Sequence, residues 1–167
     1  MHDVKPTAGL PKAAAYREIL GQLAALFAGE RSGLANAANM AAALYQALPG
    51  VNWAGFYFLQ DGALVLGPFQ GNVACVRIAV GKGVCGTAAR RLETIVVPDV
   101  SAFPGHIACD AASRSEIVVP LVGNGSLLGV LDLDSPEPAR FDGEDSAGLN
   151  AAVELLLRAS DFGRVAG

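Results

Sequence analysis

The three cysteines of this 167-residue chain, Cys75, Cys85 and Cys109, are the side chains best suited to redox chemistry. Nine residues lie between the first two and twenty-three between the last two. These spacings fit neither a zinc knuckle nor a disulfide-rich scaffold, in which cysteines lie close together in sequence. We therefore expect free thiols, which persist in a reducing cytoplasm.

Cys109 differs from the other two cysteines because it lies in a long loop of small residues, 99–113. Loops of this length inside a compact domain are usually functional or mobile. A thiolate there could attack an electrophilic sulfur atom, and either Cys75 or Cys85 could then condense with the resulting sulfenic acid. The ordinary alternative is that each cysteine is a small buried side chain. His106 could lower the pKa of Cys109, but a surface histidine is the usual interpretation.

Glu116, Asp132 and Asp134 fall at positions that a β-hairpin would bring to one face of a sheet. The two expected strands, 116–122 and 126–134, flank an Asn-Gly pair. A two-residue turn would mix polar and apolar side chains on both faces. A three-residue loop over 123–125 would instead pair Glu116 with Asp132 and align the aliphatic side chains on the opposite face, so we predict that register.

Three carboxylates held close together repel one another, which raises the pKa of at least one and lets it donate a proton near neutral pH. The same cluster suits an ammonium group. The alternatives are a solvated sheet face or salt bridges to Arg77 or Arg114. Trp53 and Tyr57, four residues apart on another expected strand, share a face and could form the aromatic wall of a ligand pocket. Core packing is the default interpretation for a tryptophan.

Residues 81–86 (GKGVCG) match the G-x-G-x-x-G pattern of dinucleotide sites. The helix expected after them spans only about seven residues, and the surrounding strands look antiparallel, so the βαβ unit that such a site requires is missing. We therefore predict a turn whose backbone could line a pocket.

The apolar pattern predicts the elements that position these residues. Helical spacing appears in 12–28, in 34–48 and after Asp142, which we expect to be a helix N-cap. Alternation predicts strands at 51–60, 63–69, 74–80, 94–97, 116–122 and 126–134, with a short helix ending near Arg91. Hairpins with helices gathered at the chain ends indicate an α+β fold, an antiparallel sheet covered by helices on one face. Residues 1–11 are expected to form a flexible N-terminal arm before a single domain, 12–162.

Composition excludes several classes of protein. With 52% hydrophobic and 17% charged residues, disorder is excluded. The net charge of -4 argues against nucleic-acid binding, which needs a basic face. No apolar run reaches the roughly 18 residues of a membrane span. The stretch 19–28 (ILGQLAALFA) lacks the positive region of a signal peptide, so we expect a cytoplasmic protein whose partner is a small molecule.

Six segments together resemble the free methionine-(R)-sulfoxide reductases, which are single GAF domains: 51–59 (VNWAGFYFL), 66–75 (LGPFQGNVAC), 81–88 (GKGVCGTA), 99–109 (DVSAFPGHIAC), 113–120 (SRSEIVVP) and 129–135 (GVLDLDS). The resemblance covers roughly residues 10–160, the span expected of one domain. It implies a six-stranded antiparallel sheet, helices packed on one face, a small-molecule pocket on the other, and a homodimer to which the first and last helices contribute.

The resemblance also implies roles for individual residues. It assigns the nucleophile to Cys109, the resolving thiol to Cys75 and an auxiliary thiol to Cys85. The implied substrate-binding residues are Trp53, Tyr57, Glu116, Asp132 and Asp134. The implied reaction reduces free L-methionine (R)-sulfoxide through a sulfenic acid and a disulfide between the nucleophile and the resolving thiol. Thioredoxin would recycle that disulfide, with NADPH as ultimate donor and neither a metal nor a bound cofactor.

The main alternative function is a non-catalytic GAF sensor module that binds a small molecule and relays its occupancy through the helices. An effector domain would favour this alternative, and the combination of three cysteines with three carboxylates favours the enzyme.

Overall fold

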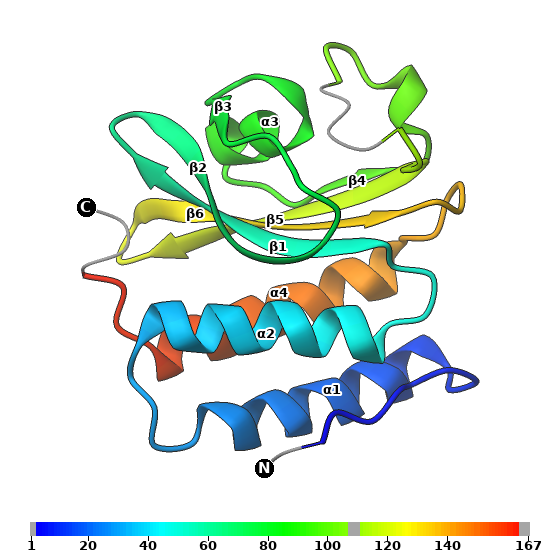
Figure 1. The fold of residues 1–167 in the computed structure, drawn as a ribbon, viewed down its shortest axis with the longest axis vertical. Helices are drawn as coiled ribbons and strands as arrows, with labels where there is room; N and C mark the ends of the chain where they lie inside the picture. The colour runs from blue at the N-terminus through cyan, green and yellow to red at the C-terminus, as the bar shows by residue number, and fades with distance from the viewer. Residues whose placement is uncertain (1–2, 107–110, 164–167) are drawn as a thin grey trace.

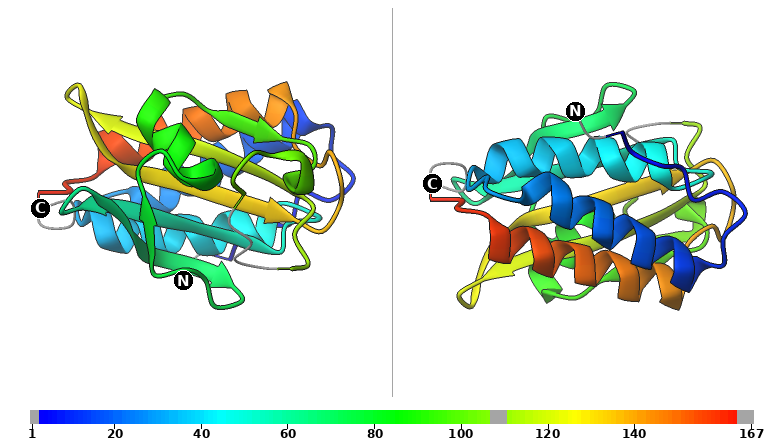
Figure 2. Two further views of the ribbon diagram at one scale, coloured as in Figure 1. Left: turned by 90° about the horizontal axis from the view of Figure 1, so that it is seen from above. Right: turned by 90° about the horizontal axis from the view of Figure 1, so that it is seen from below.

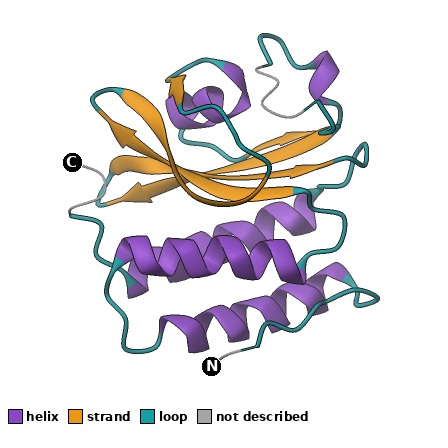
Figure 3. Cartoon of the chain, in the orientation of Figure 1, coloured by secondary structure: helices purple, strands orange, loops and turns teal. Residues whose placement is uncertain are grey.

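The computed structural model describes residues 3–106 and 111–163, which form a curved sheet with long helices on one side (Figure 1). The elements in chain order are α1 (Lys12–Phe27), α2 (Gly33–Ala47), β1 (Trp53–Gln60), β2 (Ala63–Gly71), β3 (Arg77–Ala79), α3 (Gly83–Arg91), β4 (Ile95–Val97), the short 3-10 helix η1 (Val100–Ala102), β5 (Ser115–Gly123), β6 (Ser126–Ser135) and α4 (Gly143–Ala159). Figure 3 shows how helices and strands separate into layers.

The strands form one antiparallel sheet in the order β3-β2-β1-β6-β5-β4. Helices α2 and α4 pack against one face, and α1 lies beyond them as an outer layer (Figures 1 and 2). This arrangement confirms the predicted α+β fold. The short helix α3 lies on the opposite face, where it contacts β5 and β6. Helix α3 therefore covers part of the face that the long helices leave free.

Alternating side chains of the strands separate two hydrophobic clusters, one on each face of the sheet. On β5, Ile117 and Val119 face the long helices, whereas Val118 belongs to the cluster beneath α3. On β6, Leu131 and Leu133 likewise face the helices. Because side chains alternate along a strand, the intervening carboxylates must point to the α3 face.

The hairpin between β5 and β6 corrects the predicted register. Asn124 and Gly125 both have positive φ, 51° and 77°, which is what a two-residue type I′ turn needs. The predicted three-residue loop is therefore wrong. A bulge at Leu128 then shifts the pairing, so that Glu116 lies opposite Asp134 rather than Asp132. The expected face of each carboxylate is nevertheless confirmed.

The connection between β2 and β3 differs from the predicted strand 74–80, because only Arg77–Ala79 pairs with β2. Residues 72–76, called the 72–76 strap below, run irregularly across the α3 face. Two side chains of β1 hold it: the Trp53 indole N–H donates to the Asn72 carbonyl (3.0 Å), and the Tyr57 hydroxyl donates to the Cys75 carbonyl (3.1 Å). In the 72–76 strap, these side-chain hydrogen bonds take the place of the backbone hydrogen bonds that would hold a regular strand.

A buried carboxylate joins α1 to α4. Asp142 caps α4 as predicted, and Asp145 completes a capping box with it. The fully buried Asp145 also accepts hydrogen bonds from Tyr16 (2.8 Å) and Arg140 (3.2 Å), and it forms an ion pair with Lys12. This network anchors the outer helix on the layer beneath it. Within the described residues, no helix combines the length and apolarity needed to cross a membrane.

Replacing Tyr16 by Phe tests this anchor. The substitution removes the hydroxyl that donates to Asp145, so we expect the free energy of unfolding to fall by about 1.5–3 kcal/mol, the usual value for a hydrogen bond to a charged group. Urea denaturation measures the change. The control Tyr45→Phe alters a side chain that is 37% exposed and should change stability by less than about 0.5 kcal/mol. Equal effects of the two substitutions would contradict the anchor.

Candidate functional site

A cleft lies on the α3 face of the sheet, between the strands, α3, the 72–76 strap and the loop that precedes β5. Its lining residues are Trp53, Tyr57, Val73, Ala74, Ile78, Lys82, Gly83, Val84, Cys85, His106, Ser113, Glu116, Asp132 and Asp134. All five predicted substrate-binding residues line this cleft. The segment 82–85 does as well, which agrees with the interpretation of the glycine-rich stretch as a turn beside a pocket.

Strand pairing explains why the aromatic and acidic residues meet. Trp53 on β1 lies opposite Asp134 on β6, which in turn lies opposite Glu116 on β5. Asp132 is opposite Gly55, which has no side chain on this face. A Cβ atom at Gly55 would come within 2.6 Å of the Trp53 ring, so the glycine lets the indole lie close to the sheet.

Glu116 and Asp132 are each only 6% exposed. Burial raises the pKa of both carboxyls well above their usual values, and the neighbouring acids add to the effect: Asp134 acts on Glu116, and Glu116 acts on Asp132. The pair therefore holds a proton at pH values at which two exposed carboxyls would be fully ionised. Such a group can supply a proton, or exchange it for a bound cation.

For the buried pair Glu116 and Asp132, the predicted alternative of salt bridges to Arg77 or Arg114 is not what the described part of the chain shows. There, neither Arg77 nor Arg114 forms an ion pair with Glu116 or Asp132. Glu116 instead has His106 beside it, with 3.7 Å between Nε2 and Oε2. A carboxyl pair without an arginine partner has capacity for a cationic ligand.

His106 corrects the expectation of a surface histidine. Its side chain is 18% exposed and lines the cleft beside Glu116. Burial lowers the pKa of His106, which favours the neutral ring. Sequence reasoning also missed Ser113 as a cleft residue, because both side chains lie outside the strands and no periodicity predicts where they point.

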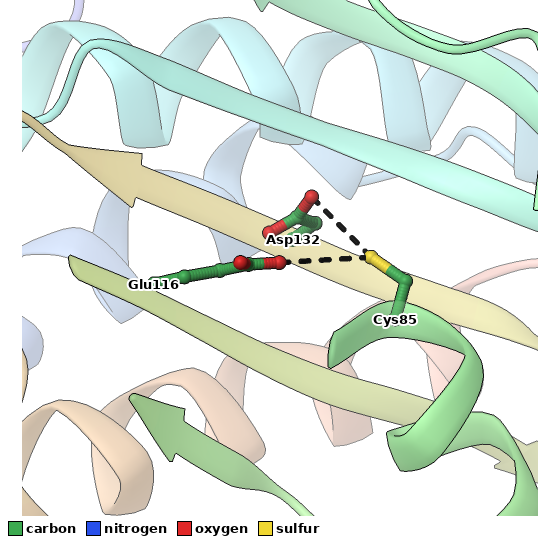
Figure 4. Close-up of side chains that lie close together, drawn as sticks. All are labelled: Cys85, Glu116 and Asp132. Atoms are coloured by element: carbon green, nitrogen blue, oxygen red, sulfur yellow. Dashed lines mark hydrogen bonds between the residues drawn. The ribbon is translucent and has the colours of Figure 1, made fainter. Parts of the chain in front are cut away.

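Cys85 lies next to the carboxyl pair, as Figure 4 shows. Its sulfur is 3.4 Å from Asp132 Oδ2 and 4.0 Å from Glu116 Oε1. Burial raises the pKa of this thiol well above its ordinary value, and the charges of Asp132 and Glu116 raise it further. No pattern of residues predicts this contact, because it depends on how α3 folds over the sheet.

Of the other two cysteines, only Cys75 lies within the described residues. Cys75 is a half-buried free thiol on the 72–76 strap, at the residue whose carbonyl accepts from Tyr57. Cys109 lies outside the described residues, so its predicted role as nucleophile stays a prediction. The predicted pairing of Cys75 with Cys109 stays a prediction for the same reason.

Two buried polar atoms of the cleft have no hydrogen-bond partner among the described residues: Asp132 Oδ1 and Ser113 Oγ. Buried polar atoms are nearly always satisfied, so a pair of unsatisfied ones in a cleft points to a polar ligand. An unpartnered acceptor such as Asp132 Oδ1, on a carboxyl beside that of Glu116, matches the N–H donors of an ammonium group.

Cys85, Glu116 and Asp132 could also share a metal ion, since their ligand atoms lie within 4.8 Å of one another. A metal would require the thiolate, whereas burial favours the protonated thiol. An ammonium group needs no thiolate and can be bound while Cys85 keeps its proton. The donor set therefore fits an ammonium group better than a metal ion.

Comparison with known proteins agrees with this fold and cleft. The sequence profile of the GAF domain matches residues 12–160. Free methionine-R-sulfoxide reductase of Escherichia coli K12 is 53% identical over 150 residues, 88% of this chain and 91% of that protein. Free methionine-R-sulfoxide reductase of Saccharomyces cerevisiae is 45% identical over 157 residues, 87% of each chain.

Among solved structures, the free methionine-R-sulfoxide reductase of Neisseria meningitidis in complex with its substrate superimposes with a TM-score of 0.90. It is 47% identical, and the match covers 95% of both chains. The chain belongs to the GAF-domain family, and within it to the group that contains the free methionine-R-sulfoxide reductases.

The substitution Asp132→Asn tests whether the cleft holds an unfavourable buried carboxyl. A carboxyl whose pKa is raised by folding stabilises the native state at low pH, and this contribution is lost as pH rises through the raised pKa. We therefore expect the Asn variant to exceed the wild-type Tm at pH 7.5 by about 3 °C. The difference should vanish near pH 4, about the unfolded pKa.

Scanning fluorimetry at the two pH values measures this difference. Glu93→Gln, at an exposed position, is the matched control and should show no such pH dependence. An Asp132→Asn variant that is less stable than the wild type at pH 7.5 would show that the carboxylate is a net stabilising group, contrary to this account.

Proposed function

We propose that the protein reduces free L-methionine (R)-sulfoxide to methionine. The observation that carries this proposal is the buried carboxyl cluster beside an aromatic wall, with an acceptor atom of Asp132 that has no partner among the described residues. The names of the relatives in E. coli and yeast support the same activity.

The ammonium group of the substrate is what the cluster would recognise. A free amino acid carries this group, whereas a methionine sulfoxide within a peptide does not. Glu116, Asp132 and Asp134 offer carboxylate oxygens to its three N–H donors. The methyl sulfoxide end would lie by the rings of Trp53 and Tyr57, which stack with 6.0 Å between their centroids. Because the carboxyls bind the ammonium group and the rings bind the sulfoxide end, the site selects the free amino acid over a peptide.

Cys109 supplies the nucleophile in this proposal. It follows His106 by three residues and precedes Ser113 by four, and both of these line the cleft. The thiolate attacks the sulfoxide sulfur and forms a bond to it, while a proton from the carboxyl pair, or from water held by it, is added to the sulfoxide oxygen. The new S–S bond then breaks as the hydroxyl group passes from the substrate sulfur to the cysteine sulfur. The cysteine sulfur is oxidised by two electrons to sulfenic acid, and the substrate sulfur is reduced to the thioether of methionine.

Cys75 then condenses with the sulfenic acid, which releases water and forms the Cys75–Cys109 disulfide. Thioredoxin exchanges its two thiols for that disulfide and returns both cysteines to the reduced state, with NADPH as ultimate donor. The half-buried position of Cys75 on an irregular strap supports this role, since a resolving thiol must be reachable. Such a cycle operates in a reducing compartment, which favours the cytoplasm.

We also propose a homodimer formed through α1 and α4. These helices pack side by side away from the cleft (Figure 2), so their association would leave the site open.

A coupled assay with thioredoxin, thioredoxin reductase and NADPH tests the function. We expect NADPH oxidation with the free (R)-sulfoxide, at least a hundredfold less with the (S) epimer, and none with the sulfoxide inside a peptide. Turnover of neither free epimer would contradict the enzymatic function and favour a sensor module. Equal turnover of the peptide would contradict recognition through the ammonium group.

Two variants separate the reduction of the sulfoxide from the formation of the disulfide. Cys109→Ser should abolish the formation of methionine. Cys75→Ser should still form about one equivalent of methionine per protein in a single turnover, and leave a sulfenic acid that dimedone traps. An active Cys109→Ser variant would refute the assignment of the nucleophile.

A further inference from the structure

Cys85 is the one thiol that the proposed cycle does not use. It lies in the first turn of α3, is only 5% exposed, and points at Asp132 and Glu116 (Figure 4). Its sulfur lies 3.4 Å from Asp132 Oδ2, which is hydrogen-bond distance for sulfur. In this contact the thiol donates and the Asp132 oxygen accepts.

The surroundings keep the proton on this thiol. A helix N-terminus lowers the pKa of a nearby thiol. Here burial is the larger influence and acts in the opposite direction, as do the charges of the adjacent acids. A buried thiol that retains its proton reacts poorly with a sulfenic acid or a disulfide, because the thiolate is the nucleophile. Cys85 is therefore badly suited to an auxiliary redox role.

We propose that Cys85 is a positioning residue whose S–H donates to Asp132 Oδ2 and holds that carboxylate so that Oδ1 is presented to the ammonium group of the substrate. This role rests on the function proposed above. It accounts for the difference between the two oxygens of Asp132, since Oδ2 accepts from Cys85 and Oδ1 has no partner among the described residues.

The backbone around α3 fixes the position of the donor. Gly86 follows Cys85 directly, and a Cβ atom there would lie 2.4 Å from the Ala79 carbonyl oxygen. The Gly81 N–H also donates to the Gly86 carbonyl, at 2.7 Å. Only glycine allows this close approach, so the first turn of α3 is tied to the end of β3. The thiol is thus held over the carboxyl pair by the fold.

Serine and alanine replacements distinguish three roles of Cys85. Cys85→Ser retains a donor and should keep kcat/KM within about threefold of the wild type. Cys85→Ala lacks the donor and should raise the KM for free methionine sulfoxide at least tenfold, with a smaller change in kcat. A redox role predicts equal losses in both variants, and a packing role predicts that alanine is tolerated better than serine. Either pattern would overturn the proposal.

The pH profile is the second readout. The titratable groups around Asp132 are Glu116, Asp134, Cys85, His106 and Lys82. The Cys85 hydrogen bond favours the ionised form of Asp132. Without it, the carboxylate that binds the ammonium group forms only at higher pH, so the acid limb of kcat/KM should move to higher pH in Cys85→Ala but not in Cys85→Ser. An unmoved limb in Cys85→Ala would contradict the positioning role.

Disulfide mapping of the wild-type protein avoids the risk that a variant fails to fold. After one turnover without thioredoxin, Cys85 should remain a thiol that N-ethylmaleimide labels only after denaturation. Recovery of Cys85 in a disulfide would overturn the proposal. An inactive wild-type protein would instead refute the proposed function, so the two failures are distinguishable.

Discussion

The burial of Glu116 and Asp132 side by side is the constraint on which the rest of the site depends. Two adjacent carboxyls lose hydration in the cleft and repel each other when ionised, so the fold must offset this cost elsewhere. The opposite face of the same strands does so: Ile117, Leu131 and Leu133 are fully buried against the helical layer. One face of the sheet stabilises the protein, and the other holds a carboxyl pair whose fully ionised form needs a cationic partner.

The two thiols among the described residues, Cys75 and Cys85, lie in settings that suit different tasks. Cys85 is enclosed beside the acids, whereas Cys75 lies on the strap that Trp53 and Tyr57 hold. The aromatic wall and the strap are therefore one unit, because the rings that line the cleft also bond to the backbone of the segment that carries Cys75.

The sequence predicted the fold and the acidic face because both depend on periodicity. The predicted pairing of Glu116 with Asp132 was wrong, yet each carboxylate points where expected. The predicted and observed registers differ by two residues, and a shift of two keeps every side chain on its face. The bulge at Leu128 could not be foreseen, since no residue there requires it.

Contacts between separate elements were beyond sequence reasoning. The contact between Cys85 and Asp132 depends on the path of α3 across the sheet. The contact between His106 and Glu116 depends on a loop whose residues have no regular spacing. Hydrophobic patterns describe one element at a time, so they say which face a residue occupies but not what lies opposite. The resemblance to a known family supplied the roles, and the geometry gives them a physical basis.

Titration calorimetry on the Cys109→Ser protein tests the central claim, that a protonated carboxyl pair exchanges its proton for the ammonium group of a free amino acid. Binding of L-methionine sulfoxide at pH 6.5, measured in buffers of different ionisation enthalpy, should release protons and should tighten as pH rises. N-acetylmethionine sulfoxide, which lacks the ammonium group, should not bind. Equal binding of the acetylated compound, or binding without proton release, would contradict the account.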